Sequence, residues 1–389
     1  MKRSLVFNLF LFFSISASEY TIHKPLHSAH EQFSLKFLNA AYKDGVNIQI
    51  CPFAIETILK GLSFGSYKIT NYEFQEVLKN PLKMDELIEF NQLVNLNLQT
   101  ALNKGEYFQK QALFVSSSII VDPVFLSMTQ KLCPFETLIE DTSKTTASKI
   151  QEWLSNKFKK GFFKLSEFNL KETKGKISPI SYIDFSFQWQ MPFDPLLTSI
   201  DSFQYPESLN VQGIVDMMQQ VILTDYYEDE SLQAVEIPLE NHLAALIFLP
   251  KTQEIKKLVE SLEKPIYLKK IVSKMKPTAV DLKFPKINFE APFYYKEPLL
   301  KMGLSQAFSK LADFRQIDSS HAISLDSPIQ ICRLHFHEGG INTEQINKQK
   351  KYLPLKSGSV MYVNHPFIFF IVDSRDLTIY NMGCYQSPF

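Results

Sequence analysis

The residues whose type and spacing could do chemistry lie near the carboxyl end of the chain. His335 and His337 alternate along a strand-like run, so their side chains share a face, and Glu338 follows them. A third suitably placed ligand is not evident, so we expect no metal site. No nucleophile elbow of the serine hydrolase kind is predicted either, and we expect no enzymatic activity.

A long polar segment follows these residues. Glu338-Gly339-Gly340 closes the strand, about twenty charged, loop-like residues come next, and Asn364 to Phe370 opens a buried strand. Long loops inside compact domains are uncommon and usually functional. We therefore expect the activity of the chain to reside in this loop.

Composition narrows the range of partners. The chain has 389 residues, of which 45% are hydrophobic, enough for a large core. Basic and acidic side chains number 41 each, so no net field attracts nucleic acid or an anionic membrane. We expect a protein partner or a small ligand, and no cofactor.

The amino terminus has the pattern of a secretory signal peptide over residues 1–18. Lys2 and Arg3 are followed by an apolar run from Leu5 to Phe13 and then by small residues. A run of about nine residues is too short to cross a bilayer, which needs roughly twenty. The sequence therefore predicts a secreted, extracellular protein.

The chain has four cysteines without the close pairs of zinc sites: Cys51, Cys133, Cys332 and Cys384. Their apolar surroundings indicate buried thiols. One disulfide is the alternative in an oxidising compartment.

Apolar periodicity predicts a single α+β domain over residues 19–389. Helical spacing covers residues 27–43, 52–59, 145–159 and 254–276, with two further helices between 74 and 102. Strands are predicted at 112–121, 183–189, 235–239, 243–249, 280–284 and 329–336, with a hairpin at 367–384.

Ten short motifs, taken in order, identify a family. They are Cys51-Pro52-Phe53-Ala54-Ile55, Leu62-Ser63-Phe64-Gly65, Ala112-Leu113-Phe114-Val115, Tyr182 to Trp189 with Pro192-Phe193, Val215-Asp216-Met217-Met218, Pro285-Lys286, Ala312-Asp313-Phe314, Glu338-x-Gly340, Asn364-x-Pro366-Phe367 and Met382-Gly383. Each is weak alone, but the ordered set resembles the serpin family over nearly the whole of residues 19–389.

The resemblance implies a large antiparallel β-sheet, smaller sheets and about nine helices, with an exposed reactive-centre loop at about residues 339–362. In inhibitory serpins a protease cleaves this loop, which then inserts into the sheet as a new strand and carries the acyl-linked protease with it. The resemblance implies a protein that is not an enzyme, and we expect a monomer.

Two residue sets would control insertion, according to the resemblance. At the breach, Glu338 would pair with Lys286 beside Trp189; the alternative is a rim ion pair worth about 0 to 1 kcal/mol. At the shutter the family uses serines, an asparagine and a histidine. This chain instead has Cys51, Ala54, Ser181 and Gln330.

The hinge also departs from the family pattern, a short run of small residues. Here it is Gly340, Ile341, Asn342, Thr343, Glu344 and Gln345. Alternate residues of an inserted strand face the core, and the inward set would be Ile341, Thr343, Gln345, Asn347, Gln349 and Lys351. The first two favour strand, but an amide buried without partners costs about 1 to 3 kcal/mol.

The resemblance places the scissile bond to within about one residue, because counts from the two ends of the loop differ by one. We call the residue before that bond the bait. The reactive-site candidates are Pro354, Leu355, Lys356 and Ser357. Leu355 suits a chymotrypsin-like pocket and Lys356 a trypsin-like one. The alternative is that the loop lysines only maintain solubility.

Two functions follow from the resemblance. The first is a suicide inhibitor of a serine protease or of a cysteine protease. The second is a non-inhibitory serpin that acts as a binding or carrier protein, or as a protease substrate. Heparin activation is not expected, because the segment that resembles the heparin-binding helix carries Asp85, Glu86 and Glu89.

Overall fold

The computed structural model describes most of the chain from residue 17 onward. The described residues are 17–79, 86–89, 91–92, 94, 107–132, 136–140, 152–154, 177–209, 211–264, 266–289, 291–319, 323–326, 328–343, 346 and 358–388. Residues 1–16 of the signal-peptide pattern, Cys133 and most of the helix predicted at 145–159 lie outside them, and the last two residues of the pattern begin the first helix.

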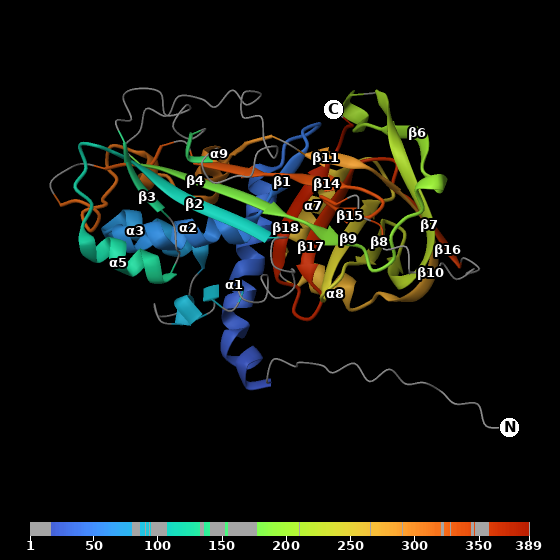
Figure 1. Cartoon of the computed structure of the whole chain (residues 1–389), viewed down its shortest axis with the longest axis horizontal. Coiled ribbons are helices and arrows are strands. Elements are labelled where there is room, and N and C mark those ends of the chain that lie inside the picture. Colours follow the sequence, from blue (N-terminus) through green and yellow to red (C-terminus); the bar gives the residue numbers. More distant parts are fainter. Residues whose placement is uncertain are drawn as a thin grey trace.

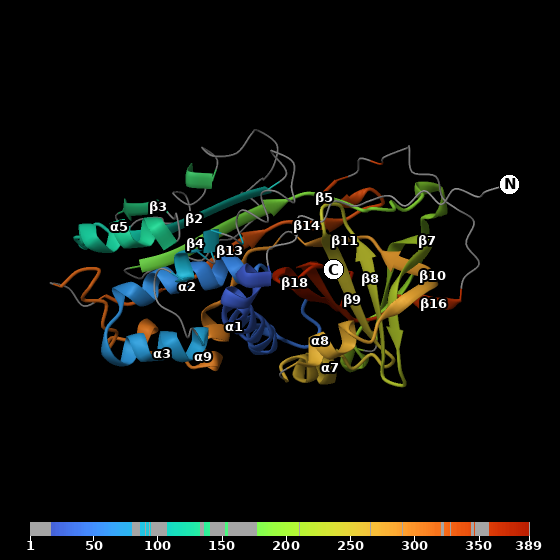
Figure 2. The ribbon, with the colours of Figure 1, turned by 90° about the horizontal axis from the view of Figure 1, so that it is seen from below.

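The amino-terminal third is helical, as predicted. Its helices are α1 (Ala17–Ala41), α2 (Pro52–Gly65), α3 (Lys68–Leu78) and α5 (Pro123–Leu132). A proline starts α2, where its fixed φ suits the first helical turn. Nearly every residue of α2 is buried, because the helix lies between the central sheet on one side and α1 and α3 on the other (Figure 2).

The central sheet has five strands in the order β12-β13-β4-β2-β3. Their bounds are β2 (Tyr107–Ser116), β3 (Glu136–Glu140), β4 (Ile177–Phe185), β12 (Phe293–Tyr294) and β13 (Ile329–Cys332). The expected large sheet is thus present, and it is mixed. The β4–β2 pair is antiparallel, whereas β4–β13 and β2–β3 are parallel.

A four-stranded sheet continues the central sheet at one end, in the order β11-β14-β15-β5. The strands are β5 (Phe187–Gln188), β11 (Ile287–Phe289), β14 (Leu334–Phe336) and β15 (Gly340–Ile341). The run at 329–336, predicted as one strand, is therefore two strands that meet at Arg333.

The remaining strands form a nine-stranded sheet in the order β1-β18-β17-β9-β8-β7-β10-β16, with β6 paired to β7 (Figure 1). Their bounds are β1 (Ile48–Ile50), β6 (Ser199–Gln204), β7 (Gln212–Glu228), β8 (Leu232–Pro238), β9 (Leu243–Pro250), β10 (Lys276–Pro285), β16 (Ser359–Tyr362), β17 (Phe367–Asp373) and β18 (Ile379–Tyr385). The hairpin predicted at 367–384 is confirmed as β17 and β18.

Short helices connect these strands. They are α7 (Ile255–Leu262), α8 (Tyr267–Val272), α9 (Lys296–Met302) and the 3-10 turns Pro195–Leu197, Glu207–Leu209 and Gln306–Phe308. The helix predicted over 254–276 is interrupted, because Ile266 takes a left-handed conformation with φ of 70°. No helix among the described residues is both long enough and apolar enough to cross a membrane.

Candidate functional site

A parallel seam divides the central sheet. We use "seam" for the pairing of β4 with β13, in which Ile180–Ile183 lie opposite Ile329–Cys332. Above the seam the two chains continue as β5 and β14, and these are not paired with each other, because β15 lies between them. The sheet is therefore closed along the seam and forked at its upper end.

The first two hinge residues occupy this fork as a strand. Gly340 and Ile341 pair antiparallel with β5, and Ile341 also pairs with Phe336 of β14. Ile341, predicted as the first inward-facing residue, is fully buried. Gly340 has φ of +157°, and a Cβ there would lie 1.9 Å from the carbonyl oxygen of Phe187. Only glycine fits this position.

The chain leaves the sheet immediately after β15. Asn342 has a left-handed φ of 53°, and Thr343 is half-buried. At the other end of the predicted loop at 339–362, β16 pairs parallel with β10. Strands therefore occupy both ends of this loop. The other predicted hinge and reactive-site residues lie outside the described residues: Glu344, Gln345, Pro354, Leu355, Lys356 and Ser357.

The predicted breach residues lie together beside the fork. Lys286 Nζ is 2.8 Å from Glu338 Oε1, which also accepts a 2.8 Å hydrogen bond from the Thr198 hydroxyl. Burial alone would raise the pKa of the Glu338 carboxyl, but the hydrogen bonds from Lys286 and Thr198 lower it overall. The indole of Trp189 is buried and donates to the carbonyl of His337. Thr198 was not found from the sequence.

The predicted shutter residues lie in the seam and at the start of α2. Ser181 and Gln330 belong to the seam, and Cys51 and Ala54 belong to the start of the helix. The Gln330 side chain accepts from the Cys51 N–H at 2.7 Å and donates to the Cys51 carbonyl at 3.0 Å. Ala54 is held through its carbonyl, which accepts from Gln111 Nε2 at 2.6 Å. Ser181 lies opposite Gln330 across the seam, and its buried hydroxyl has no hydrogen-bond partner among the described residues.

Two thiols complete the shutter. Cys51 Sγ and Cys332 Sγ are 3.3 Å apart, and Asn381 Nδ2 donates to the first of them at 3.0 Å. Burial raises the pKa of the Cys332 thiol well above its ordinary value, and the hydrogen bond with Cys51 raises it further. The predicted burial of Cys51, Cys332 and Cys384 is confirmed, and all three are free thiols.

Comparison with known proteins settles the family. The family model described as serpin, serine protease inhibitor, matches residues 28–388. The chain belongs to the serpin family. Serpins are protease inhibitors or carriers and not enzymes, and the fold predicted from the motifs is confirmed.

Similar serpins include proteins of both kinds. Alpha-1-antichymotrypsin of Homo sapiens is 25% identical over 88% of this chain and 82% of its own length. Thyroxine-binding globulin of Mus musculus is 26% identical over 95% of this chain and 90% of its own length. The crystal structure of mouse protein-Z dependent protease inhibitor has a TM-score of 0.81, with 18% identity, and covers 96% of this chain and 100% of that one.

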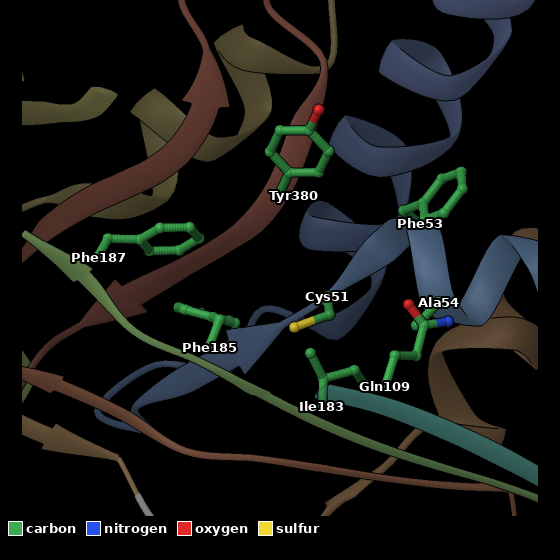
Figure 3. Close-up of a pocket in the computed structure, with 8 residues that line it drawn as sticks. All are labelled: Cys51, Phe53, Ala54, Gln109, Ile183, Phe185, Phe187 and Tyr380. Atoms are coloured by element: carbon green, nitrogen blue, oxygen red, sulfur yellow. The ribbon is translucent and has the colours of Figure 1, made fainter. Parts of the chain in front are cut away.

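A small cavity in this serpin lies between the start of α2 and the upper ends of β4 and β5. Its volume is about 10 Å³, room for about one water molecule. Figure 3 shows Ile183 and Phe185 of β4 approaching Cys51 and Ala54 at the start of α2. The inward side chains of an inserted strand would have to enter this packed layer, so large ones must displace their neighbours.

Other chemistry is not supported by the described part of this serpin. No cluster of three or more possible metal ligands occurs there, and the rings of His335 and His337 lie 5.8 Å apart. Residues 61–65 have the Gly-x-Ser-x-Gly spacing of a hydrolase elbow. They are instead the end of α2, where Ser63 is buried and donates to the Lys60 carbonyl.

Proposed function

We propose that this serpin is a secreted inhibitor of a serine protease or of a cysteine protease, which acts by inserting its cleaved loop into the seam. The observation that carries the proposal is that Gly340 and Ile341 already form a strand in the fork above the seam. These two residues can therefore nucleate the strand that the cleaved loop would form. The amino-terminal signal pattern supports secretion.

The register of this nucleus matches that of the seam below it. Continuing the β15 pairing downward places residue 345 opposite Ile183 on one side and opposite Cys332 on the other. Ile183 and Cys332 are themselves partners in the seam. A new strand could thus grow from Ile341 without a slip in register, gaining backbone hydrogen bonds along both edges.

The same register gives the amides of the loop polar surroundings. It brings residue 347, an asparagine, between Ser181 and Gln330 of the shutter. The Ser181 hydroxyl has no hydrogen-bond partner among the residues that the structure describes, and it can bond to an inserted amide. The unusual hinge and the unusual shutter are therefore complementary, which reduces the cost of burying the asparagine.

The test is incubation with chymotrypsin and, separately, with trypsin, followed by a denaturing gel and mass identification of the cut bond. A covalent complex that survives detergent, with cleavage between 354 and 357, is expected. Leu355 or Lys356 would then be the bait. Cleavage without a complex would contradict the proposal.

A second function is favoured by a specific observation. The chain turns out of the sheet at Asn342, and the inward set that follows contains Gln349 and Lys351, which are costly to bury. These features favour a loop that does not insert, as expected of a non-inhibitory carrier or binding protein. In that case the loop is cut cleanly by both proteases, and the temperature midpoint of unfolding does not rise afterwards.

A further inference from the structure

We propose that the side chain of Asn342 is a latch that holds the fork closed and sets the rate at which the loop enters the seam. The inference rests on the proposed function, because it assigns a regulatory residue to the same insertion. It concerns a residue that has left the strand and yet is bonded to both sides of the fork.

The Asn342 amide bridges the two sides of the sheet. Its Nδ2 donates to the Phe185 carbonyl at 2.6 Å and to the Arg333 carbonyl at 2.9 Å. Its Oδ1 accepts from the His335 N–H at 2.8 Å. Both amide hydrogens and the oxygen are thus used, and this pattern fixes which amide atom is nitrogen.

The main chain of Asn342 adds to the bridge. Its N–H donates to the His335 carbonyl at 2.7 Å, and its carbonyl accepts a longer bond of 3.4 Å from the Ser186 hydroxyl. Phe185 ends β4, whereas Arg333 and His335 belong to the β13–β14 chain. The residue therefore joins the two chains at the point where the seam begins.

The amide occupies the place of an inserted strand. In the uncleaved form the Phe185 and Arg333 carbonyls and the His335 N–H face the fork, and they are groups that a new strand would bond through its backbone. To extend β15, Asn342 must leave the left-handed region, and its side chain must turn to the face opposite that of Ile341. Every bond of the amide has to break before Thr343 can pair.

A second contact crosses the seam at the same level. One guanidinium nitrogen of Arg333 lies 3.3 Å from both carboxylate oxygens of Asp184 on β4. Neighbouring strands lie about 4.8 Å apart, so a strand placed between them would separate this pair by about that distance. The latch and this ion pair break in the same step, but only the amide must also vacate the path of the strand.

Removal of the amide should therefore speed insertion. The variant Asn342→Gly removes the bridge while allowing the left-handed backbone, so it destabilises the closed form, in which the amide bonds are made. The variant Asn342→Ser retains a polar side chain that is too short to span the fork. Both variants should insert at least ten times faster than the parent after the loop is cut.

The matched control is Asn47→Gly. Asn47 also uses its amide on the main chain, with bonds to Gln386 N–H and to both the N–H and the carbonyl of Ser387. It precedes β1 of the nine-stranded sheet, whereas the fork belongs to the four-stranded sheet. Its loss should lower the stability of the fold without changing the rate of insertion.

The experiment uses the full chain in a Trp153→Phe background, so that Trp189 is the single tryptophan. Trp189 stacks on Phe336 and bonds to the His337 carbonyl at the fork, so its fluorescence should report the growth of β15. Thermolysin cuts the loop, with the bond identified by mass. It is a zinc protease that forms no acyl-enzyme, so insertion is measured apart from trapping.

Faster insertion in both Asn342 variants, with the parent rate in Asn47→Gly, supports the latch. Equal rates in the parent and the Asn342 variants overturn it, as does equal acceleration in Asn47→Gly or the absence of insertion in every cleaved protein. The gel assay separates the two proposals. If the Asn342 variants insert faster but no covalent complex forms, the latch is supported and the inhibitor function is contradicted. If a complex forms but the insertion rates are equal, the inhibitor function is supported and the latch is contradicted.

Discussion

A buried charge cluster joins α1 and α2. Glu56 Oε2 lies 2.5 Å from His30 Nδ1, and Glu56 Oε1 lies 2.9 Å from Lys60 Nζ. His30 Nε2 lies 2.9 Å from the Ile379 carbonyl, so both ring nitrogens lie within hydrogen-bonding distance of an oxygen atom. All three side chains are 1% exposed. One buried carboxylate therefore bonds to a buried imidazole and to a buried ammonium group.

Replacing Glu56 by Gln should lower the free energy of unfolding by about 3 to 5 kcal/mol, because the buried Lys60 ammonium then lacks its counter-charge. Denaturant unfolding of the variant measures the loss. The control is Glu76→Gln, which breaks the exposed ion pair with Lys79 and should cost about 0 to 1 kcal/mol. An equal effect of the two variants would contradict the role given to the cluster.

The same carboxyl makes stability depend on pH. Burial would raise the pKa of Glu56, but Lys60 and His30 outweigh it and lower the pKa to about 2, against 4.5 in the unfolded chain. The unfolded chain therefore takes up this proton first as pH falls. The contribution is full above pH 4.5 and is lost between 4.5 and about 2. Unfolding curves across this range should show a steeper fall for the parent than for Glu56→Gln.

Sequence reasoning could predict that cysteines are buried, but not which groups they meet. Glu56 and Lys60 have the spacing of an exposed helical ion pair, and only the packing of α1 against α2 shows that they are buried. The place of Cys332 in the shutter could have been predicted, because it lies two residues beyond Gln330 and its side chain therefore shares the same face of the strand.

At the level of elements, Gln330 ties β13 to the start of α2. Replacing it by Ala removes the bond to the buried Cys51 N–H and leaves the Cys51 carbonyl with its 3.4 Å bond from the Ile55 N–H, which should lower the free energy of unfolding by about 1 to 3 kcal/mol. Denaturant titration measures this loss. Gln32→Ala, at an exposed side-chain bond to Ser28, should change stability by less than about 0.5 kcal/mol. A neutral Gln330→Ala would show that the tie contributes nothing.

Strand positions were within reach of the apolar patterns in the sequence, whereas strand breaks were not. Apolar runs at 243–249 and 280–284 fall within β9 and β10 because both segments are buried by their neighbours. The two-residue β15 has too few residues for a periodic signal, and the break at Arg333 serves the fork. These features arise from contacts between distant segments.

At the scale of the whole molecule, the proposed inhibition depends on the fork. Gly340→Ala places a methyl group against the Phe187 carbonyl and should exclude the hinge from the sheet, so the loop is cut without forming a complex. The number of serpin molecules consumed per protease inhibited measures this change. The control Gly358→Ala is at the other end of the loop, where a Cβ meets only a 3.7 Å contact, and should inhibit like the parent. Trapping by Gly340→Ala at the parent level would contradict this role.

The position of the hairpin β17–β18 has a consequence for synthesis of the chain. These two strands come after the others in the sequence, yet they lie inside the nine-stranded sheet, where β17 pairs with β9 and β18 pairs with β1. Ile48 therefore cannot pair until its partner Cys384 has been synthesised. At about 5 to 20 residues per second, translation keeps the edges of β1 and β9 open for roughly 20 to 70 seconds and about 6 to 25 seconds respectively. A nascent chain of this protein therefore exposes unpaired strand edges, which favour aggregation, until β17 and β18 have been synthesised.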